Sequence, residues 1–316
     1  MFKLIIKSIS TQTIKYRNAS SLNRLYSTSN NSGSNGSHFN MEKMSKKKYT
    51  PIDTPKLLSI SSFFRYPEGG VNEYANLSKG TAFLVQTPKS GFIGKPNNSI
   101  YCISCAHITH PFQFPNLYKE EQYSWLYVLG ESNIKAQLEY RDDETGKLLH
   151  SIPLKPPYYL HPLLDLVVFK VDEDDFKKSN IPYQASIIEL EPYDFPKEGN
   201  PGRLFGYQLV NEKENIMKPM QIDFQFHFAE SSERFFLSTE SVSPMGVCGG
   251  PVVNIENEVI GMVEGLVQID PTLIDKTPNP KKREFLRKTN NNTVFIPSQV
   301  LNNFISSIDS NIGFSP

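Results

Sequence analysis

The chain has 316 residues, which is long enough for one large or two medium-sized domains with a buried core. It carries 33 basic and 33 acidic residues, so its overall charge gives no reason to expect binding to nucleic acid or to a membrane surface. No apolar run approaches the roughly 18 residues that a membrane-spanning helix needs. The composition therefore predicts a soluble globular protein with no membrane span and no nucleic-acid partner.

The N-terminal segment is basic and contains no acidic residue before Glu42. It is also rich in Ser, Thr and Asn, a composition typical of mitochondrial transit peptides. The tetrapeptide Arg24-Leu25-Tyr26-Ser27 resembles the cleavage pattern of such peptides. We therefore expect residues 1–30 to direct the protein to the mitochondrion, with the matrix as its compartment, and residues 31–54 to be a polar linker. A polar N-terminus without a targeting role is the alternative.

The sequence contains three cysteines, Cys102, Cys105 and Cys248. An odd, small number without regular spacing argues against a disulfide framework. Cys102 and Cys105 form a C-x-x-C pair inside an apolar, strand-like run, and no second such pair or histidine pair completes a zinc site. We expect both to be small buried residues, and we expect no metal.

Beyond residue 55, short runs rich in Val, Ile, Phe and Tyr alternate with clusters of Gly, Pro, Asn and Asp. Examples are residues 81–85, 99–105, 164–171 and 259–263. This pattern predicts many short strands and an all-β fold.

Two segments near the C-terminus differ from this pattern. After Pro297, apolar residues recur at helical spacing and predict a short amphipathic helix: Val300, Leu301, Phe304, Ile305 and Ile308. The preceding stretch, residues 270–292, is polar and basic, and we interpret it as a solvated loop, with nucleic-acid binding as the alternative.

The most specific segment is Gly246-Val247-Cys248-Gly249-Gly250-Pro251. Glycines beside a nucleophile let the backbone turn tightly, so that N–H groups can converge on one point. Cys248 is the predicted nucleophile, and the amides of Gly246 and Cys248 are the predicted oxyanion hole for a tetrahedral intermediate. The alternative for this cysteine is a small core residue in a barrel strand.

Two other segments supply a predicted base and the acid that orients it. His107 follows the strand-like run Ile103–Ala106, and Asp165 precedes the run Leu166–Val171. The order His107, Asp165, Cys248 is that of the chymotrypsin class of triads. The alternatives are that His107 is a core histidine whose hydrogen bonds are made within the core, and that Asp165 is a turn residue at the start of a strand.

Together these segments resemble the chymotrypsin- or trypsin-like peptidases, including the HtrA-type catalytic domain, with cysteine in place of the nucleophilic serine. Gly80–Val85 is similar to the family's G-[ST]-x-F-L-V strand, and Thr293–Ser298 to the segment before its terminal helix. The resemblance covers about residues 60–308. It implies two six-stranded antiparallel Greek-key barrels, over residues 55–185 and 186–308, the second including a short C-terminal helix. The site would lie in the cleft between them.

The resemblance also implies where a polypeptide substrate binds. Val263, Glu264 and Gly265 would line the strand that pairs with substrate by β-addition. Val242, six residues before Cys248, would lie near the floor of the specificity pocket. The implied activity is peptide-bond hydrolysis by a Cys-His-Asp triad without a metal or other cofactor.

Two departures from the family leave other hypotheses open. Val247 stands where trypsin-type enzymes carry an aspartate, and cysteine replaces serine as the nucleophile. A catalytically inactive pseudoprotease that binds peptides or protein partners in the same cleft is therefore the alternative function. Thiol redox sensing through Cys248 or the Cys102/Cys105 pair is a third.

Overall fold

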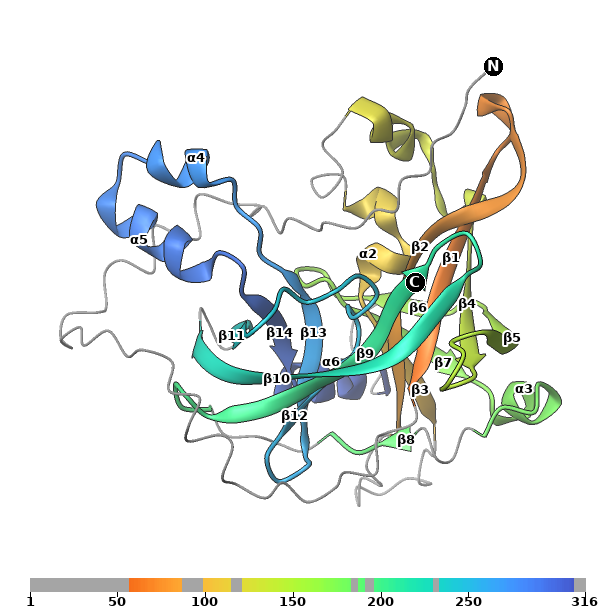
Figure 1. Cartoon of the computed structure of the whole chain (residues 1–316). Coiled ribbons are helices and arrows are strands. Elements are labelled where there is room, and N and C mark those ends of the chain that lie inside the picture. Colours follow the sequence, from red (N-terminus) through yellow and green to blue (C-terminus); the bar gives the residue numbers. More distant parts are fainter. Residues whose placement is uncertain are drawn as a thin grey trace.

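The computed structural model describes residues 57–86, 99–114, 121–182, 187–190, 196–229 and 233–309. Within these residues two groups of strands lie side by side, and most helices lie at their margins (Figure 1). The predicted transit peptide and linker, residues 1–30 and 31–54, lie outside the described residues.

The first group of strands is one eight-stranded sheet with the order β5-β4-β1-β2-β3-β7-β6, in which β8 pairs in parallel with β2. No hydrogen bonds between β5 and β6 close it within the described residues. This half therefore contains eight strands instead of the six expected, because the short segments β6 and β8 also pair. The strands are β1 (Leu58–Tyr66), β2 (Val71–Gln86), β3 (Ile100–Ser104), β4 (Ile134–Arg141), β5 (Leu148–Leu154), β6 (Tyr158–Leu160), β7 (Val167–Val171) and β8 (Ile187–Ile188).

The second group forms a closed antiparallel barrel with the order β10-β11-β14-β13-β12-β9. The predicted six-stranded barrel in this half is confirmed. Apolar side chains from facing strands fill its interior, which is the usual way in which a small barrel is stabilised. The strands are β9 (Pro201–Asn211), β10 (Ile216–Ala229), β11 (Phe235–Thr239), β12 (Pro251–Asn254), β13 (Val259–Leu266) and β14 (Thr293–Pro297).

The predicted amphipathic helix is also confirmed. Helix α6 (Ser298–Asp309) follows β14 directly and packs against β13 and β14. Four of the five apolar residues named from the sequence are buried on its inner face: Leu301, Phe304, Ile305 and Ile308.

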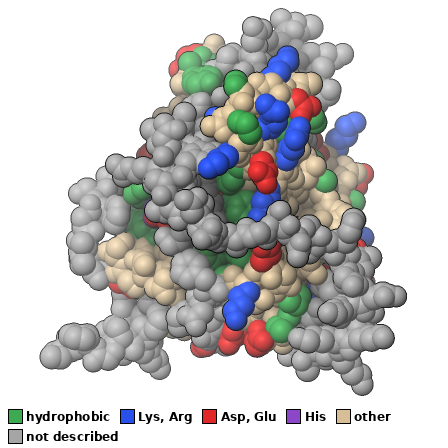
Figure 2. Space-filling view, turned by 90° about the vertical axis from the view of Figure 1, so that its left-hand side faces the viewer, with side chains coloured by type: hydrophobic (Ala, Val, Ile, Leu, Met, Phe, Trp, Pro, Cys, Tyr) green, Lys and Arg blue, Asp and Glu red, His purple; other side chains and the backbone are tan. Residues whose placement is uncertain are grey.

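The basic stretch over residues 270–292 is helical, so its interpretation as a loop was wrong. It forms α4 (Pro271–Asp275) and α5 (Pro280–Thr289). Asn279 caps α5 by accepting a hydrogen bond from the Lys282 amide, and Pro280 occupies the first helical position, where no amide donor is needed. The two helices project from the barrel (Figure 1), and Lys and Arg side chains gather near the top of the molecule seen from that side (Figure 2).

The remaining helices are short, and most lie in connections between strands. They are α2 (Ala106–Thr109), α3 (Glu173–Lys178), η2 (Pro67–Gly69), η3 (Pro111–Gln113), η5 (Glu121–Val128) and η6 (Glu131–Asn133). None of the helices in the described part of the chain has the length and apolar character needed to cross a membrane.

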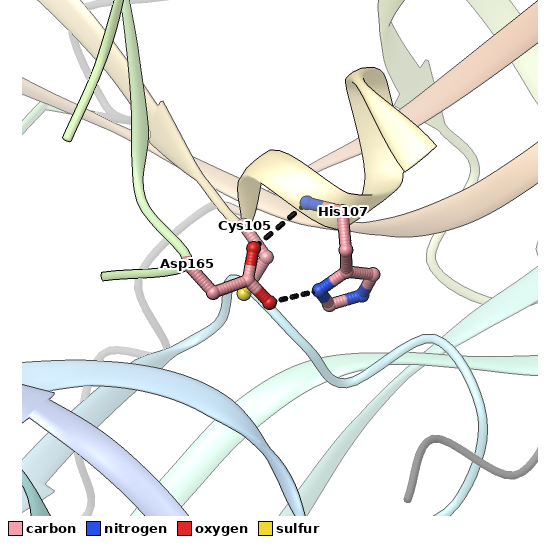
Figure 3. A group of neighbouring side chains, drawn as sticks. All are labelled: Cys105, His107 and Asp165. Carbon is pink, nitrogen blue, oxygen red and sulfur yellow. Dashed lines mark hydrogen bonds and ion pairs between the residues drawn. The ribbon is translucent and has the colours of Figure 1, made fainter. Parts of the chain in front are cut away.

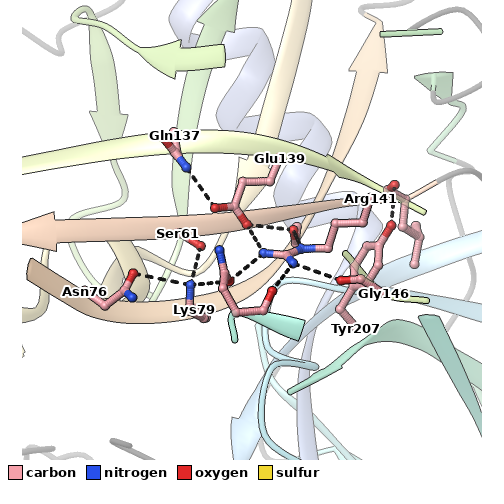
Figure 4. A network of polar contacts seen from close by, with 11 residues as sticks. Ser61, Asn76, Lys79, Gln137, Glu139, Arg141, Gly146 and Tyr207 are labelled. Atoms are coloured by element: carbon pink, nitrogen blue, oxygen red, sulfur yellow. Dashed lines mark hydrogen bonds and ion pairs between the residues drawn. The ribbon is translucent and has the colours of Figure 1, made fainter. Parts of the chain in front are cut away.

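A polar network connects the two halves (Figure 4). Arg141 and Glu139, both on β4, form an ion pair, and their side chains are fully buried. Arg141 also donates through Nη1 to the carbonyl of Asn215, 2.6 Å away, in the β9–β10 turn. Lys79 on β2 donates to the side-chain oxygen of the same asparagine over 2.7 Å. Because buried charges must be paired to be tolerated, this network fixes the β9–β10 hairpin against the first sheet.

Replacing Arg141 should therefore destabilise the protein strongly. We expect Arg141→Met to lower the free energy of unfolding by about 3–5 kcal/mol, because it leaves the Glu139 carboxylate buried without its ion pair. Urea unfolding followed by circular dichroism measures this. Arg287→Met is the matched control: its ion pair with Asp275 is exposed, and its loss should change stability by about 0–1 kcal/mol. Equal effects of the two substitutions would contradict the assigned role.

Candidate active site

The pairing of β3 with β7 brings His107 and Asp165 together. Ser104, the last residue of β3, pairs with Val167, the first residue of β7, in an antiparallel ladder. The residues that follow β3 therefore lie beside those that precede β7. His107 is in the single turn of α2 just after β3, and Asp165 is in the turn just before β7.

Asp165 contacts His107 at two points (Figure 3). Its Oδ2 is in hydrogen-bond contact with the ring Nδ1 of His107, and its Oδ1 accepts from the His107 backbone N–H over 2.7 Å. Such a two-point attachment fixes both the ring orientation and the nitrogen that carries the proton. With Nδ1 engaged by Asp165, Nε2 is the ring nitrogen left to interact with Cys248.

The surroundings of His107 favour its protonated form. Burial lowers the pKa of this fully buried ring, but the charge and hydrogen bond of Asp165, together with a hydrogen bond and charge interaction with Cys248, raise the pKa to about 10. This is the arrangement in which an imidazolium stabilises a neighbouring thiolate.

Cys248 lies in the turn that leads from β11 into β12. Gly246 and Gly249 on either side of it have positive φ angles of 96° and 85°, a region that side chains disfavour. The loop is held to β13 by reciprocal hydrogen bonds, from the Gly249 amide to the Val263 carbonyl and from the Val263 amide to the Gly250 carbonyl, each 2.8 Å long. The glycines singled out in the sequence thus shape the turn that contains the cysteine.

Thr81 on β2 fixes this loop against the first sheet. Its amide donates to the Cys248 carbonyl over 2.9 Å, and its hydroxyl donates to the Gly246 carbonyl over 2.7 Å. The Thr81 carbonyl in turn accepts from the hydroxyl of Ser104, three residues before His107, over 2.8 Å. No role was predicted for Thr81 from the sequence, although its place in the motif Gly80–Val85 was a signal.

The predicted oxyanion hole has one available donor on the Gly246 side. Within the described residues the Gly246 amide donates to no backbone or side-chain acceptor. Gly246 and Cys248 both line a hollow in the surface, together with Ser243, Met245 and Leu266. The assignment of these two amides to an oxyanion hole stays a prediction.

The residues predicted to bind substrate occupy different environments. Val242 is 52% exposed and does not line the hollow, whereas its neighbour Ser243 does. The side chain of Val263 lies in the barrel core, and that of Glu264 is only 2% exposed. Gly265 is buried in β13. The side chains of Val263 and Glu264 therefore do not face the hollow. Pairing of a substrate strand with β13 would use backbone groups and not these side chains, so β-addition stays a prediction.

Cys105 lies beneath the His107–Asp165 pair. Its buried thiol donates to the Val263 carbonyl over 3.2 Å, which links β3 to the barrel. Burial raises the pKa of this thiol, and the negative charges of Asp165, Cys248 and Glu264 raise it further, although a hydrogen bond from the Gly249 amide opposes them. Cys102 is likewise buried, and burial raises the pKa of its thiol. The expectation that both are small buried residues is confirmed.

Cys105, His107 and Asp165 also form a compact group of potential ligand atoms, which all lie within 4.8 Å of one another. A metal ion at this point would have to displace the hydrogen bond between the imidazole and the carboxylate. We therefore assign these atoms to the hydrogen-bonded pair.

Comparison with known proteins gives no family assignment. No family model matches the chain, and none of the curated proteins matches it.

Gly249 offers a test of how tightly the loop is held. A Cβ at this position would lie 2.1 Å from the Thr81 carbonyl oxygen and 2.6 Å from the Ser104 hydroxyl. Gly199 has a similar φ of 84°, but a Cβ there would meet no described atom within 4 Å. We expect Gly199→Ala to cost about 1–2 kcal/mol of unfolding free energy from backbone strain alone, and Gly249→Ala to cost clearly more. Urea unfolding compares them. Equal losses would show that the loop is free to shift away from β2.

Proposed function

We propose that this chain is a cysteine-type endopeptidase of the chymotrypsin-like fold. In this proposal Cys248 is the nucleophile, His107 carries the proton and Asp165 orients the ring. The observation that carries the proposal is that one imidazole interacts with a carboxylate and with the glycine-flanked thiol, although the three residues come from distant segments.

The strand order supports the proposed fold. In a Greek key, a fourth strand returns to lie beside the first, giving the spatial order 4-1-2-3. The barrel contains the order β12-β9-β10-β11, and the first sheet contains β4-β1-β2-β3. The two halves thus repeat one connectivity, as two Greek-key halves would.

The proposed reaction proceeds in two stages. The Cys248 thiolate attacks the scissile carbonyl carbon, and the resulting oxyanion accepts a hydrogen bond from the Gly246 amide. His107 gives its proton to the leaving amine as the C–N bond breaks, which leaves a thioester. Neutral His107 then takes a proton from water, whose hydroxide attacks the thioester. The acid product leaves, and the Cys248 thiolate and the His107 imidazolium are restored.

The substrate in this proposal is a polypeptide, and the hollow beside Cys248 supplies its nearest contacts. Apolar side chains on its wall include Leu77, Leu209, Met245 and Leu266. These favour an apolar substrate side chain close to the scissile bond, because burying such a side chain is favourable by about 1.5–3 kcal/mol.

A second candidate function is peptide binding without hydrolysis. One observation favours it: the His107 ring is completely inaccessible to solvent. A proton carrier has to reach the leaving amine, whereas a cleft that only binds peptides needs no such access.

We also propose that the protein acts in the mitochondrion, on the basis of its basic, acid-poor N-terminal segment. We expect residues 1–41 fused to a fluorescent protein to direct it to mitochondria. The same fusion with its five basic residues replaced by glutamine should remain in the cytosol, because import signals of this kind depend on positive charge. Fluorescence microscopy with a mitochondrial dye distinguishes the two. Equal distributions of both fusions would contradict the targeting role.

The catalytic assignment is tested by replacing the nucleophile and its partner. Cys248→Ala and His107→Ala should each reduce hydrolysis of an unbiased peptide library by about 10³-fold or more, because the triad acts as a unit. Cys102→Ala is the control, since this cysteine is buried outside the site and its loss should leave turnover unchanged. Mass spectrometry of the library products provides the readout. Undiminished turnover in Cys248→Ala would exclude the mechanism, and binding of library peptides without cleavage by the unmodified protein would favour the second function.

A further inference from the structure

Glu264 is buried at a point where β13 bends. The pairing of β13 with β14 shifts register between Val263 and Gly265, so a bulge occurs at Glu264. Bulges redirect a side chain that would otherwise follow the alternation of the strand, and they are frequent beside active sites. The Glu264 side chain is 2% exposed.

Arg234 pairs with this carboxylate in a bidentate geometry. Its Nε donates to Oε2 of Glu264 over 2.7 Å, and its Nη2 donates to Oε1 over 2.8 Å. Arg234 precedes β11, so the pair joins the start of one barrel strand to the bulge in another. Charge-assisted hydrogen bonds are stronger than those between neutral groups, and the bidentate geometry also fixes the orientation of the two side chains.

The same carboxylate reaches the loop that contains the triad aspartate. Oε1 of Glu264 accepts a hydrogen bond from the Asp165 backbone amide over 3.4 Å. The Cys105 thiol also indicates that Asp165 and Glu264 lie near each other, because the charges of both carboxylates act on it. A chain of contacts therefore runs from Arg234 through Glu264 to Asp165 and on to His107.

We propose that Arg234 and Glu264 are positioning residues of the candidate site, which hold the Asp165 loop in place and set the charge that faces the His107–Asp165 pair. This inference rests on the proposed function only in calling the site catalytic. The contacts themselves connect the barrel to the turn before β7 whatever the site does.

The charges around the pair show how Arg234 acts. Glu264 faces Arg234, Asp165 and Cys105, with His161 and Glu233 also within electrostatic range of the same cluster. His107 faces Asp165 and Cys248. Two carboxylates thus lie close together, and the guanidinium of Arg234 neutralises the one that does not contact the imidazole.

Opposite charge changes should therefore move the His107 pKa in opposite directions. Arg234→Met leaves Glu264 uncompensated, and its negative charge should stabilise the imidazolium and raise the pKa. Glu264→Gln keeps an oxygen for the Asp165 amide but removes the negative charge, which should lower the pKa. The double variant removes one charge of each sign and should return the pKa close to that of the unmodified protein.

The experiment is an NMR titration of the histidine rings in the full-length protein, with the His107 signals assigned by their loss in His107→Gln. We expect shifts of about 0.5 pH units or more in each single variant, with opposite signs, and near-cancellation in the double variant. Arg234→Lys, which retains the charge, should stay close to the unmodified protein, and so should the surface control Arg287→Met. Circular dichroism confirms that each variant is folded; if Arg234→Met does not fold, Arg234→Gln replaces it.

Shifts of the same sign in both single variants, or no shift in either, would overturn the proposal. A pair with only a structural role would lower the stability of the protein when replaced, but would not produce opposite shifts of the His107 pKa. The titration does not depend on turnover, so it also separates this inference from the proposed function. Opposite shifts in a protein that cleaves no peptide would support the positioning role and reject the peptidase. Peptide cleavage without any shift of the His107 pKa in either variant would support the peptidase and reject the positioning role.

Discussion

Four hydrogen bonds of Thr81 hold the candidate site together. Through its amide and hydroxyl, this residue binds the carbonyls on both sides of Val247, and its own carbonyl receives the Ser104 hydroxyl from the strand that leads to His107. Its hydroxyl also accepts from the Tyr207 amide of the barrel over 2.8 Å. The geometry of the thiol relative to the imidazole therefore depends on the backbone and the short polar side chain of one residue between the two halves. A longer side chain could not satisfy these partners in the same space.

Buried charge is the second constraint on the arrangement. The first sheet is joined to the β9–β10 hairpin by Arg141, Glu139 and Lys79, and the barrel is joined to the Asp165 loop by Arg234 and Glu264. Charges removed from water are tolerated only with well-oriented partners, so each cluster specifies one relative placement of its elements. Apolar burial alone is less selective, because it depends mainly on the area removed from water. The polar clusters thus supply the directional contacts that align the two halves of the site.

Several features could be predicted because they depend on local pattern. Short apolar runs between turn residues predicted strands, and helical spacing after Pro297 predicted α6. The basic stretch over residues 270–292 was misjudged because its helices are short and polar, so their apolar periodicity is weak, although Asn279 and Pro280 form a recognisable helix start. The expected six strands in the first half came from the family resemblance, and the additional pairing of β6 and β8, which have only three and two residues, could not be predicted from such short segments.

The sequence by itself determined the residue types of the candidate site and the glycines that shape the cysteine loop, since backbone freedom and side-chain chemistry are properties of single residues. Only the tertiary structure decided which of them meet. The pairing of Ser104 with Val167 brings His107 to Asp165, and the bulge at Glu264 turns an expected substrate contact inward toward Arg234. Strand register and bulges depend on contacts between segments far apart in the chain, so the residue pattern of one segment by itself does not show which strand it will pair with.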